Sequence, residues 1–214
     1  MKKVFFLMTF FCVTCLFADE DISQLPPPYN QVHLMPNNLW GWYADCNKQA
    51  IENFIKTRNI MTIVEVGSWL GLSTHHMAKL LPQGGKVYAI DTWEGSPEHQ
   101  GNPILATLYD QFLSNVIHAH LTDKIIPVRM DSITASQTLN VIADLIYIDA
   151  NHSYECCYAD CNAWFSHVKS GGILCGDDWG WGDHGIERAV TQIAQEHNVQ
   201  VHVEGGWFWW LIKP

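Results

Sequence analysis

The feature that most constrains the fold is a regular alternation of short apolar runs with amphipathic segments from residue 46 onward. Short apolar runs bounded by Gly or Asp predict strands, and apolar residues three and four positions apart predict helices. The predicted strands cover residues 60–66, 86–90, 124–130, 143–148 and 172–175. The predicted helices cover residues 74–81, 103–118, 133–139, 154–168 and 185–196, and a further helix begins near Cys46.

Strands that alternate with helices specify a parallel sheet with helices on both faces. Two last strands, 200–203 and 207–212, are joined by Gly205-Gly206 and must therefore be antiparallel to each other. We expect an α/β, doubly wound fold, in which a mostly parallel seven-stranded sheet ends in an antiparallel C-terminal hairpin. One domain, residues 46–214, uses all of these elements and leaves nothing for a second domain.

The residues before this domain divide into two parts. Met1-Lys2-Lys3 precedes an uncharged apolar run, 4–18, which meets acidic residues directly after Ala18. This pattern predicts a signal peptide over residues 1–18, with an uncleaved N-terminal anchor as the alternative. In either case the remainder is expected to be exported, or anchored to a membrane and facing outside the cytoplasm. Residues 19–45 form an arm rich in Pro and aromatic residues, which predicts a lid or strap packed over the domain.

The composition indicates which classes of partner the chain can bind. The chain has 12 Lys and Arg against 22 Asp and Glu, a net charge of -10, which argues against a nucleic-acid partner. Acidic balance suits a cationic ligand, a metal ion or a neutral small molecule, and a homo-oligomer is compatible with it. Beyond residue 18 the chain has an odd number of thiols, so they cannot all pair with one another. Buried free thiols and one disulfide involving Cys46 are both compatible with the sequence. These thiols are Cys46, Cys156, Cys157, Cys161 and Cys175.

Acidic residues stand where each of the first five predicted strands ends. In an open α/β sheet, ligands bind beyond the carboxyl ends of the parallel strands, so these acids should share one rim. A helix N-cap explains any one of them, but crowded like charges are costly unless cations bind among them. The rim is therefore predicted to bind positive charge. The acids are Glu65, Asp91, Asp131, Asp149, Asp177 and Asp178.

The turn after the first strand carries Gly67 and Gly71, and Asp91 ends the second strand. A Gly-x-x-x-Gly turn is weak evidence alone, and it lacks the three-glycine spacing of a dinucleotide fingerprint. A carboxylate after the second strand can hold the ribose hydroxyls of a nucleoside. Together they predict a nucleoside without a pyrophosphate, which ranks a nicotinamide-dependent reductase below other enzymes.

Four motifs in order and spacing resemble the class I S-adenosylmethionine-dependent methyltransferases, over about residues 47–213. They are Val64-Glu65-Val66-Gly67-Ser68-Trp69-Leu70-Gly71, Tyr88-Ala89-Ile90-Asp91-Thr92-Trp93-Glu94-Gly95, Ile148-Asp149-Ala150-Asn151-His152-Ser153-Tyr154-Glu155 and Gly171-Gly172-Ile173-Leu174-Cys175-Gly176-Asp177-Asp178. The nearest branch resembles the metal-dependent O-methyltransferases that act on macrolide sugars, and the catechol-type enzymes are more distant. The implied fold is the Rossmann-like methyltransferase fold, and the implied cofactor is a sulfonium cation, S-adenosylmethionine.

The resemblance also implies roles for single residues. Those near the cofactor are Glu65, Gly67 and Ser68 at the methionine part, Asp91 at the ribose, and Asp131 with Ser132 at the adenine. Those that would hold Mg²⁺ or another divalent ion are Asp149, Asp177 and Asp178. His152 matches the position of the family's catalytic base.

Physical chemistry supports the metal and the base. Oxygen ligands suit Mg²⁺, and a neutral imidazole can take a proton from a hydroxyl whose pKa the ion has lowered. Alternatives remain: His152 can cap a helix N-terminus, and the Asp177-Asp178 pair can cap a loop. We expect an O-methyltransferase for a hydroxyl of a small molecule or sugar. The alternative is an exported, non-catalytic binding protein that holds a sugar-like or cationic ligand in the same crevice.

Other polar and aromatic residues carry weaker predictions. His75-His76 would bind a metal only with a third partner, so solvent contact or packing is favoured. Trp179 or Trp181 could form a stacking wall for a ring, although most of the C-terminal tryptophans are expected to pack in the core or at the sheet edge. His184 is a candidate for contact with the substrate.

Overall fold

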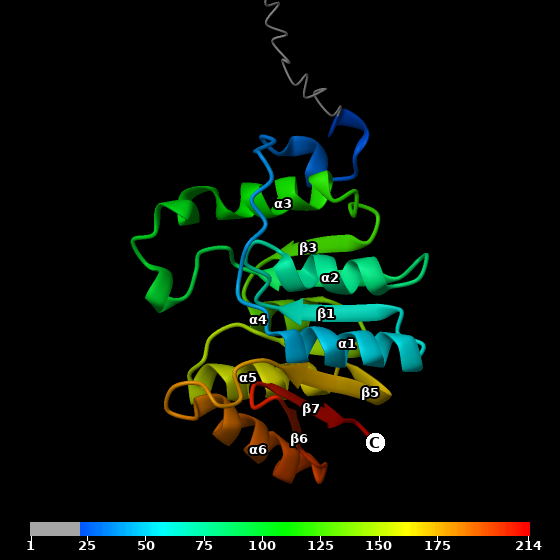
Figure 1. The fold of residues 1–214 in the computed structure, drawn as a ribbon, viewed down its shortest axis with the longest axis vertical. Coiled ribbons are helices and arrows are strands. Elements are labelled where there is room, and N and C mark those ends of the chain that lie inside the picture. The colour runs from blue at the N-terminus through cyan, green and yellow to red at the C-terminus, as the bar shows by residue number, and fades with distance from the viewer. Residues whose placement is uncertain (1–21) are drawn as a thin grey trace, which may run out of the picture.

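The computed structural model describes residues 22–214, which form a three-layer α/β domain built on a seven-stranded sheet (Figure 1). The strands are β1 (Thr62–Val66), β2 (Lys86–Asp91), β3 (Ile125–Arg129), β4 (Ala143–Ile148), β5 (Val168–Gly176), β6 (His202–Glu204) and β7 (Phe208–Ile212). They lie in the order β3-β2-β1-β4-β5-β7-β6. Strands β1 to β5 are parallel, whereas β7 is antiparallel to both of its neighbours. The predicted fold class is confirmed. The predicted signal peptide, with Cys12 and Cys15, lies outside the described residues.

Helices cover both faces of the sheet because successive strand residues point to opposite sides. On β1, Ile63 packs with the first three helices, and its neighbour Val64 packs with the last three. The first set is α1 (Asp45–Thr57), α2 (Leu72–Leu80) and α3 (Leu108–His118). The second set is α4 (Ser132–Thr138), α5 (Tyr154–Phe165) and α6 (Gly185–His197). Figure 1 shows α1 and α2 in front of the sheet and α4 behind it.

Three predicted elements differ from the structure. The predicted helix 103–118 is a 3-10 segment, η4 (Pro103–Thr107), followed by α3, and the Asn102 side chain caps the 3-10 turn by accepting from the Ile104 N–H. The predicted helix 154–168 ends at Phe165, because Val168 already pairs with Ala143 in the sheet. A register shift on β4 lets β5 take up the two glycines at 171–172, so β5 starts earlier than the sequence indicated.

Residues 22–44, here called the strap, begin beside α3 and the start of β3 and then cross to the edge at which the parallel strands end (Figure 1). Two short 3-10 turns, η1 (Ile22–Gln24) and η2 (Tyr29–Gln31), begin it. The buried Tyr29 hydroxyl donates to the Ile125 carbonyl at 2.8 Å. Polar side chains of α3 then bind the strap backbone: Asn115 accepts from the Asn38 N–H at 2.9 Å and donates to the Asn38 carbonyl at 3.1 Å.

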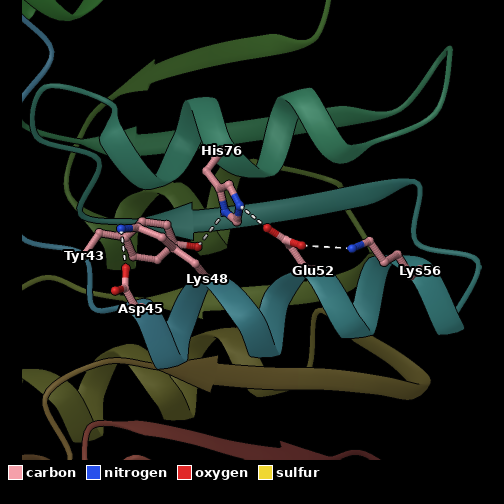
Figure 2. Close-up of polar contacts among 6 residues, drawn as sticks. All are labelled: Tyr43, Asp45, Lys48, Glu52, Lys56 and His76. Atoms are coloured by element: carbon pink, nitrogen blue, oxygen red, sulfur yellow. Dashed lines mark hydrogen bonds and ion pairs between the residues drawn. The ribbon is translucent and has the colours of Figure 1, made fainter.

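A chain of polar contacts joins the end of the strap to α1 and α2 (Figure 2). The Tyr43 hydroxyl lies 3.0 Å from His76 Nδ1, and His76 Nε2 lies 3.3 Å from a carboxylate oxygen of Glu52. Lys56 donates to the other oxygen of Glu52 at 2.9 Å. His76 is therefore engaged in the docking of the strap. His75 packs in the core, where burial lowers its pKa to about 4.

The described cysteines are all free. Cys157 and Cys161 are buried, with their sulfurs 3.9 Å apart on α5, as the buried-thiol interpretation expected. Cys46 is half-buried and unpaired, so within residues 22–214 no disulfide involves it. A helix both long and apolar enough to cross a membrane is absent from this described part of the chain.

Candidate functional site

A cleft of about 1170 Å³ opens at the carboxyl edge of the parallel strands. Its walls come from the end of the strap and from the loops that follow β1, β2, β3, β4 and β5. Strand order reverses between β1 and β4, and ligands of open α/β sheets bind at such a point because neighbouring loops diverge there. The predicted position of the site is therefore where the structure has its cleft.

Packing explains why the first residue of the turn after β1 is a glycine. Gly67 has φ +90°, and a Cβ on it would lie 1.9 Å from the Asp149 carbonyl oxygen. No other residue fits there, so the turn can lie directly against the loop that carries Asp149. The sequence suggested that a ligand needs this glycine, but contact between two loops of the chain is the reason that the structure gives.

Glu65 does not face the cleft, contrary to the prediction that six carboxylates share its rim. Its side chain is fully buried and accepts hydrogen bonds from the hydroxyls of Ser68, Ser73 and Thr74. Burial raises the Glu65 pKa to about 7, which these hydrogen bonds partly oppose. Glu65 thus fastens the glycine turn to the start of α2 from behind.

Asp91 lies at the end of β2 and holds the same turn from the other side. Its carboxylate accepts from the backbone N–H groups of Ser68 at 3.0 Å and Trp69 at 2.9 Å, and from that of Trp93 at 2.7 Å. Burial raises the pKa of Asp91. The residue also borders the cleft, together with Gly67 and Ser68, so the structure brings these three predicted residues together.

Asp131 and Ser132 border the cleft beyond β3. Asp131 is the N-cap of α4 and accepts from the Thr134 N–H at 2.9 Å. A hydrogen bond with the Thr134 side chain, and then the one from its backbone N–H, lower the pKa of Asp131. The Ser132 hydroxyl accepts from the Trp164 indole at 2.9 Å and bonds to the buried Asp160, whose pKa burial raises to about 6. The Ser132 side chain is therefore committed to α5, which fixes the backbone of this loop.

Beyond β4 and β5, three side chains converge. One ligand atom from each of Asp149, His152 and Asp178 lies within 4.8 Å of the others, a separation that a single metal ion can bridge. His152 Nε2 is 3.1 Å from a carboxylate oxygen of Asp178. Asp178 has φ +62°, a strained conformation for a residue other than Gly, and such strain persists where the surroundings hold it in place.

Asp177 is not a member of this group of three. One of its oxygens accepts from the Asp178 N–H at 2.8 Å, and its carboxylate also bonds to the side chain of Asn47. Of the predicted metal ligands, Asp149 and Asp178 lie together, with His152 at hand, while Asp177 is turned toward α1. Asp177 stays close enough that its charge raises the pKa of Asp149.

Two buried residues that sequence reasoning missed support these acids. Asn47 on α1 donates to the Tyr147 phenol oxygen at 3.0 Å, and Tyr147 in turn bonds to the Asp149 carboxylate. The sequence did contain a signal for Asn47. It is three positions before Ala50, on the apolar face of its helix, and a lone Asn on such a face needs a buried hydrogen-bond partner. Tyr147 lies on β4 two residues before Asp149, so the strand period points both side chains to the same side of the sheet.

The electrostatics of the group favour a cation. Burial, first, and the charges of Asp177 and Asp178 raise the pKa of Asp149 well above its ordinary value. Burial likewise raises the pKa of Asp177. Carboxylates that repel each other in this way are stabilised by a bound positive charge.

Aromatic residues flank the cleft on two sides. On one side, Trp40 and Trp42 of the strap gather with Trp69 and His99, and the ring centroids of Trp69 and His99 are 4.4 Å apart. Trp181 and Trp207 stand on the side of β5. Trp181 is thus the member of the predicted stacking wall that lines the cleft, whereas Trp179 packs against the core. His184 is paired with Glu187 at 3.0 Å and is not among the described residues that line the cleft.

Comparison with known families decides the assignment. A family model described as "Methyltransferase domain" matches residues 64–179, more than half of the chain, which includes the cleft loops after β1, β2, β3 and β4 and the acid pair after β5. The chain belongs to this methyltransferase-domain family. The resemblance noted in the sequence motifs is confirmed for the family, and this methyltransferase has its glycine turn, its β2 acid and its acid pair inside the matched range.

Solved structures confirm the class I methyltransferase fold. An O-methyltransferase from Bacillus cereus in complex with SAH has a TM-score of 0.60 and 20% identity, covering 84% of this chain and 84% of that chain. The O-methyltransferase TomG from Streptomyces achromogenes, involved in tomaymycin synthesis and solved with SAM, has a TM-score of 0.60, 12% identity and coverages of 78% and 79%. A SAM-dependent O-methyltransferase from Thermotoga maritima has a TM-score of 0.60, 12% identity and coverages of 82% and 67%. No curated protein sequence matches the methyltransferase.

Proposed function

We propose that the protein is an S-adenosylmethionine-dependent, divalent-metal-assisted O-methyltransferase that methylates a hydroxyl of a small molecule or sugar. The observation that carries the proposal is the meeting of Asp149, His152 and Asp178 within 4.8 Å in the cleft that Asp91 also borders. One cleft thereby offers a place for a nucleoside and, next to it, a place for a cation and a base.

The cofactor half rests on the loops after β1, β2 and β3. Asp91 borders the cleft, where an oxygen of its carboxylate can accept from a ribose hydroxyl in addition to its backbone donors, while Asp131 and Ser132 border the neighbouring end of the cleft. A sulfonium cation also suits a cleft lined by carboxylates. The cleft volume of about 1170 Å³ leaves room for an acceptor beside the cofactor. Glu65 keeps a supporting role, because it shapes the turn without reaching the cleft.

The metal half rests on the donor set. Asp149 and Asp178 supply carboxylate oxygens from neighbouring strands, and the raised pKa of Asp149 fits a site that a cation completes. A bound Mg²⁺ or Mn²⁺ would lower the pKa of an acceptor hydroxyl there. Asp177 is not a ligand in this proposal, since Asn47 and the Asp178 N–H hold its carboxylate; it adds negative charge beside the ligands.

His152 is the residue best placed to take the proton. Its ring is partly exposed at the cleft, and Nε2 is paired with Asp178, which orients the imidazole toward the acids. A neutral imidazole accepts a proton near physiological pH and needs only to lie within hydrogen-bond reach of the acceptor oxygen. Methyl transfer then depends chiefly on how the cleft aligns the two reactants.

The experiment measures Mn²⁺ binding by electron paramagnetic resonance and methyl transfer from labelled cofactor to pools of hydroxylated compounds. Asp178→Asn should weaken Mn²⁺ binding at least tenfold, whereas His184→Ala, which changes an exposed histidine outside the cleft, should change neither readout. His152→Ala should abolish turnover and leave Mn²⁺ binding intact if His152 is the base, and should weaken both if it is a ligand.

Turnover that survives exhaustive chelation would refute the metal half of the proposal. A complete lack of turnover with intact cofactor and metal binding would favour the alternative, an exported, non-catalytic binding protein. If the folded protein does not bind the cofactor, the proposal that it is a methyl-transferring enzyme is refuted.

A further inference from the structure

The charges around the cleft are strongly one-sided. Among residues 22–214, no lysine or arginine lines it, whereas five carboxylates do. These five are Asp91, Asp131, Asp149, Asp177 and Asp178. Backbone N–H groups satisfy Asp91 and Asp131 without adding a positive charge. The bound cations of the proposed function would offset part of this charge but would leave no cationic side chain for an acceptor.

The basic residues of the domain lie elsewhere. Several collect at the opposite edge of the sheet, where the parallel strands begin: Arg58, Lys86, Lys124, Lys169 and Lys213. Three that lie nearer the cleft are already engaged with aromatic rings. Lys48 is paired with Asp45 at 2.9 Å, and its ammonium lies 5.7 Å from the ring of Tyr43, which lines the cleft. The guanidinium of Arg188 lies 4.7 Å from the Tyr154 ring, and that of Arg129 lies 4.7 Å from the Tyr109 ring. The charge of the molecule is therefore divided along the strand axis, with its negative end at the cleft.

The wall beside His152 is aromatic and open. Trp181 is 52% exposed and Trp207 is 40% exposed, although both line the cleft. Their ring centroids are 6.2 Å apart, and the centroid of Trp181 is 6.1 Å from that of His152. Large apolar side chains left uncovered beside a candidate base are well placed to pack against the face of a ring.

Building on the proposed function, we propose that the acceptor is an uncharged hydroxylated ring whose face packs on Trp181, and that the carboxylates of the cleft exclude anionic acceptors. Carboxylated and phosphorylated compounds would enter a cleft that has no side chain to pair with their charge. Hydroxyl groups need only hydrogen bonds and the metal ion, both of which the floor of the cleft can supply.

The test uses two series of ligands, each of which keeps one ring and varies the charge of a substituent. With Mg²⁺ and S-adenosylhomocysteine present, quenching of tryptophan fluorescence would be measured for 4-methylcatechol, 3,4-dihydroxybenzoate and dopamine. The same measurement would use methyl glucoside, glucuronate and glucosamine. In the series that binds, the anion should bind at least about tenfold more weakly than the neutral ring. An anion that binds as tightly as the neutral ring, or no binding by any of the six, would overturn the proposal.

Variants of the aromatic wall sharpen the test. Trp181→Ala should weaken binding of the neutral ring, and Trp181→Arg should improve binding of the anion about tenfold by adding a positive charge to the wall. The control is Ile142→Arg, which adds the same charge at a residue that is 58% exposed and outside the cleft, and should leave the order of ligands unchanged. Equal behaviour of the two Arg variants would contradict the assignment of Trp181.

Failure of this inference can be told apart from failure of the proposed function. Calorimetry with S-adenosylhomocysteine reports on the cofactor site alone. If the cofactor binds but the acceptors do not follow the predicted order of charge, the acceptor class is wrong and the methyltransferase proposal stands.

Discussion

The side-chain amide of Asn47 donates a 3.0 Å hydrogen bond to the phenol oxygen of Tyr147, although the two residues are 100 positions apart. Both are fully buried. Tyr147 bonds to Asp149, and Asn47 bonds to Asp177 as well, so this pair holds two carboxylates of the cleft from beneath. The spacing of the acids therefore depends on a contact between the first helix and the central strands.

Replacement of Asn47 by Ala should destabilise the fold and loosen the acids. The Tyr147 hydroxyl would lose its buried donor, and Asp177 would lose one of its two partners. We expect the free energy of unfolding to fall by about 1–3 kcal/mol, because buried polar groups are left unpaired. Urea denaturation measures this loss.

The matched control is Asn53→Ala, which makes the same change on an exposed face of the same helix. Its effect should stay within about 0.5 kcal/mol. Equal losses in the two variants would show that the Asn47 network contributes nothing particular to stability.

Replacement of Gly67 by Ala should be among the most damaging small changes in the chain. The added Cβ would lie 1.9 Å from the Asp149 carbonyl oxygen, at φ +90°. We expect a loss of about 3 kcal/mol in the free energy of unfolding, because neither loop can retreat without moving the cleft.

The control for Gly67 is Gly101→Ala. Gly101 has φ +86°, and a Cβ there would meet nothing within 4 Å, so this variant isolates the backbone strain. It should lose only about 1 kcal/mol. Thermal or urea unfolding that gives both variants the same loss would refute the packing role of Gly67.

Glu65 should make stability depend on pH. Its pKa in the folded chain is raised to about 7, above its ordinary value of 4.5, so between these values the folded chain binds more protons than the unfolded chain. The stability that the protonated carboxyl contributes is fully present below about pH 4.5 and is lost as pH rises to about 7. Glu65→Gln keeps the shape of the neutral carboxyl. The variant should lack this pH dependence, which in the wild type lowers the free energy of unfolding by roughly 3 kcal/mol over the interval.

Urea unfolding of both proteins from pH 4.5 to pH 8 tests this prediction. Asp91 and Asp149 also have raised pKa values, so the difference between wild type and Glu65→Gln is the quantity to follow. Two curves that run parallel over this range would mean that Glu65 does not titrate within it.

Local patterns in the sequence were sufficient for the fold and for most of the cleft. Alternating elements specify the sheet, and parallel strands bring their ends to one edge, so Asp91, Asp149 and Asp178 could be placed on a shared rim. A strand end alone does not say which way its last side chain points. Glu65 precedes the end of β1 by one residue, and the period of two turns its side chain away from the cleft, toward the hydroxyls of Ser73 and Thr74 on α2.

Contacts between distant segments could not be derived in the same way. The partners of Asn47, the docking of the strap on Asn115 and the reason for Gly67 all depend on residues many positions away. Asp177 shows the consequence: its neighbour Asp178 turns into the group of three through a left-handed backbone, while Asp177 points to α1. Adjacent acids in the sequence thus have different surroundings in the fold.

Calorimetric titration of the folded protein with S-adenosylhomocysteine tests the central claim most directly. The account predicts saturable binding at one site per chain, weakened by Asp91→Ala, whose fold is checked by circular dichroism. It also predicts binding without added metal, because the residues at the cofactor end of the cleft are distinct from Asp149 and Asp178. Absence of measurable binding by the folded wild-type protein would contradict the account.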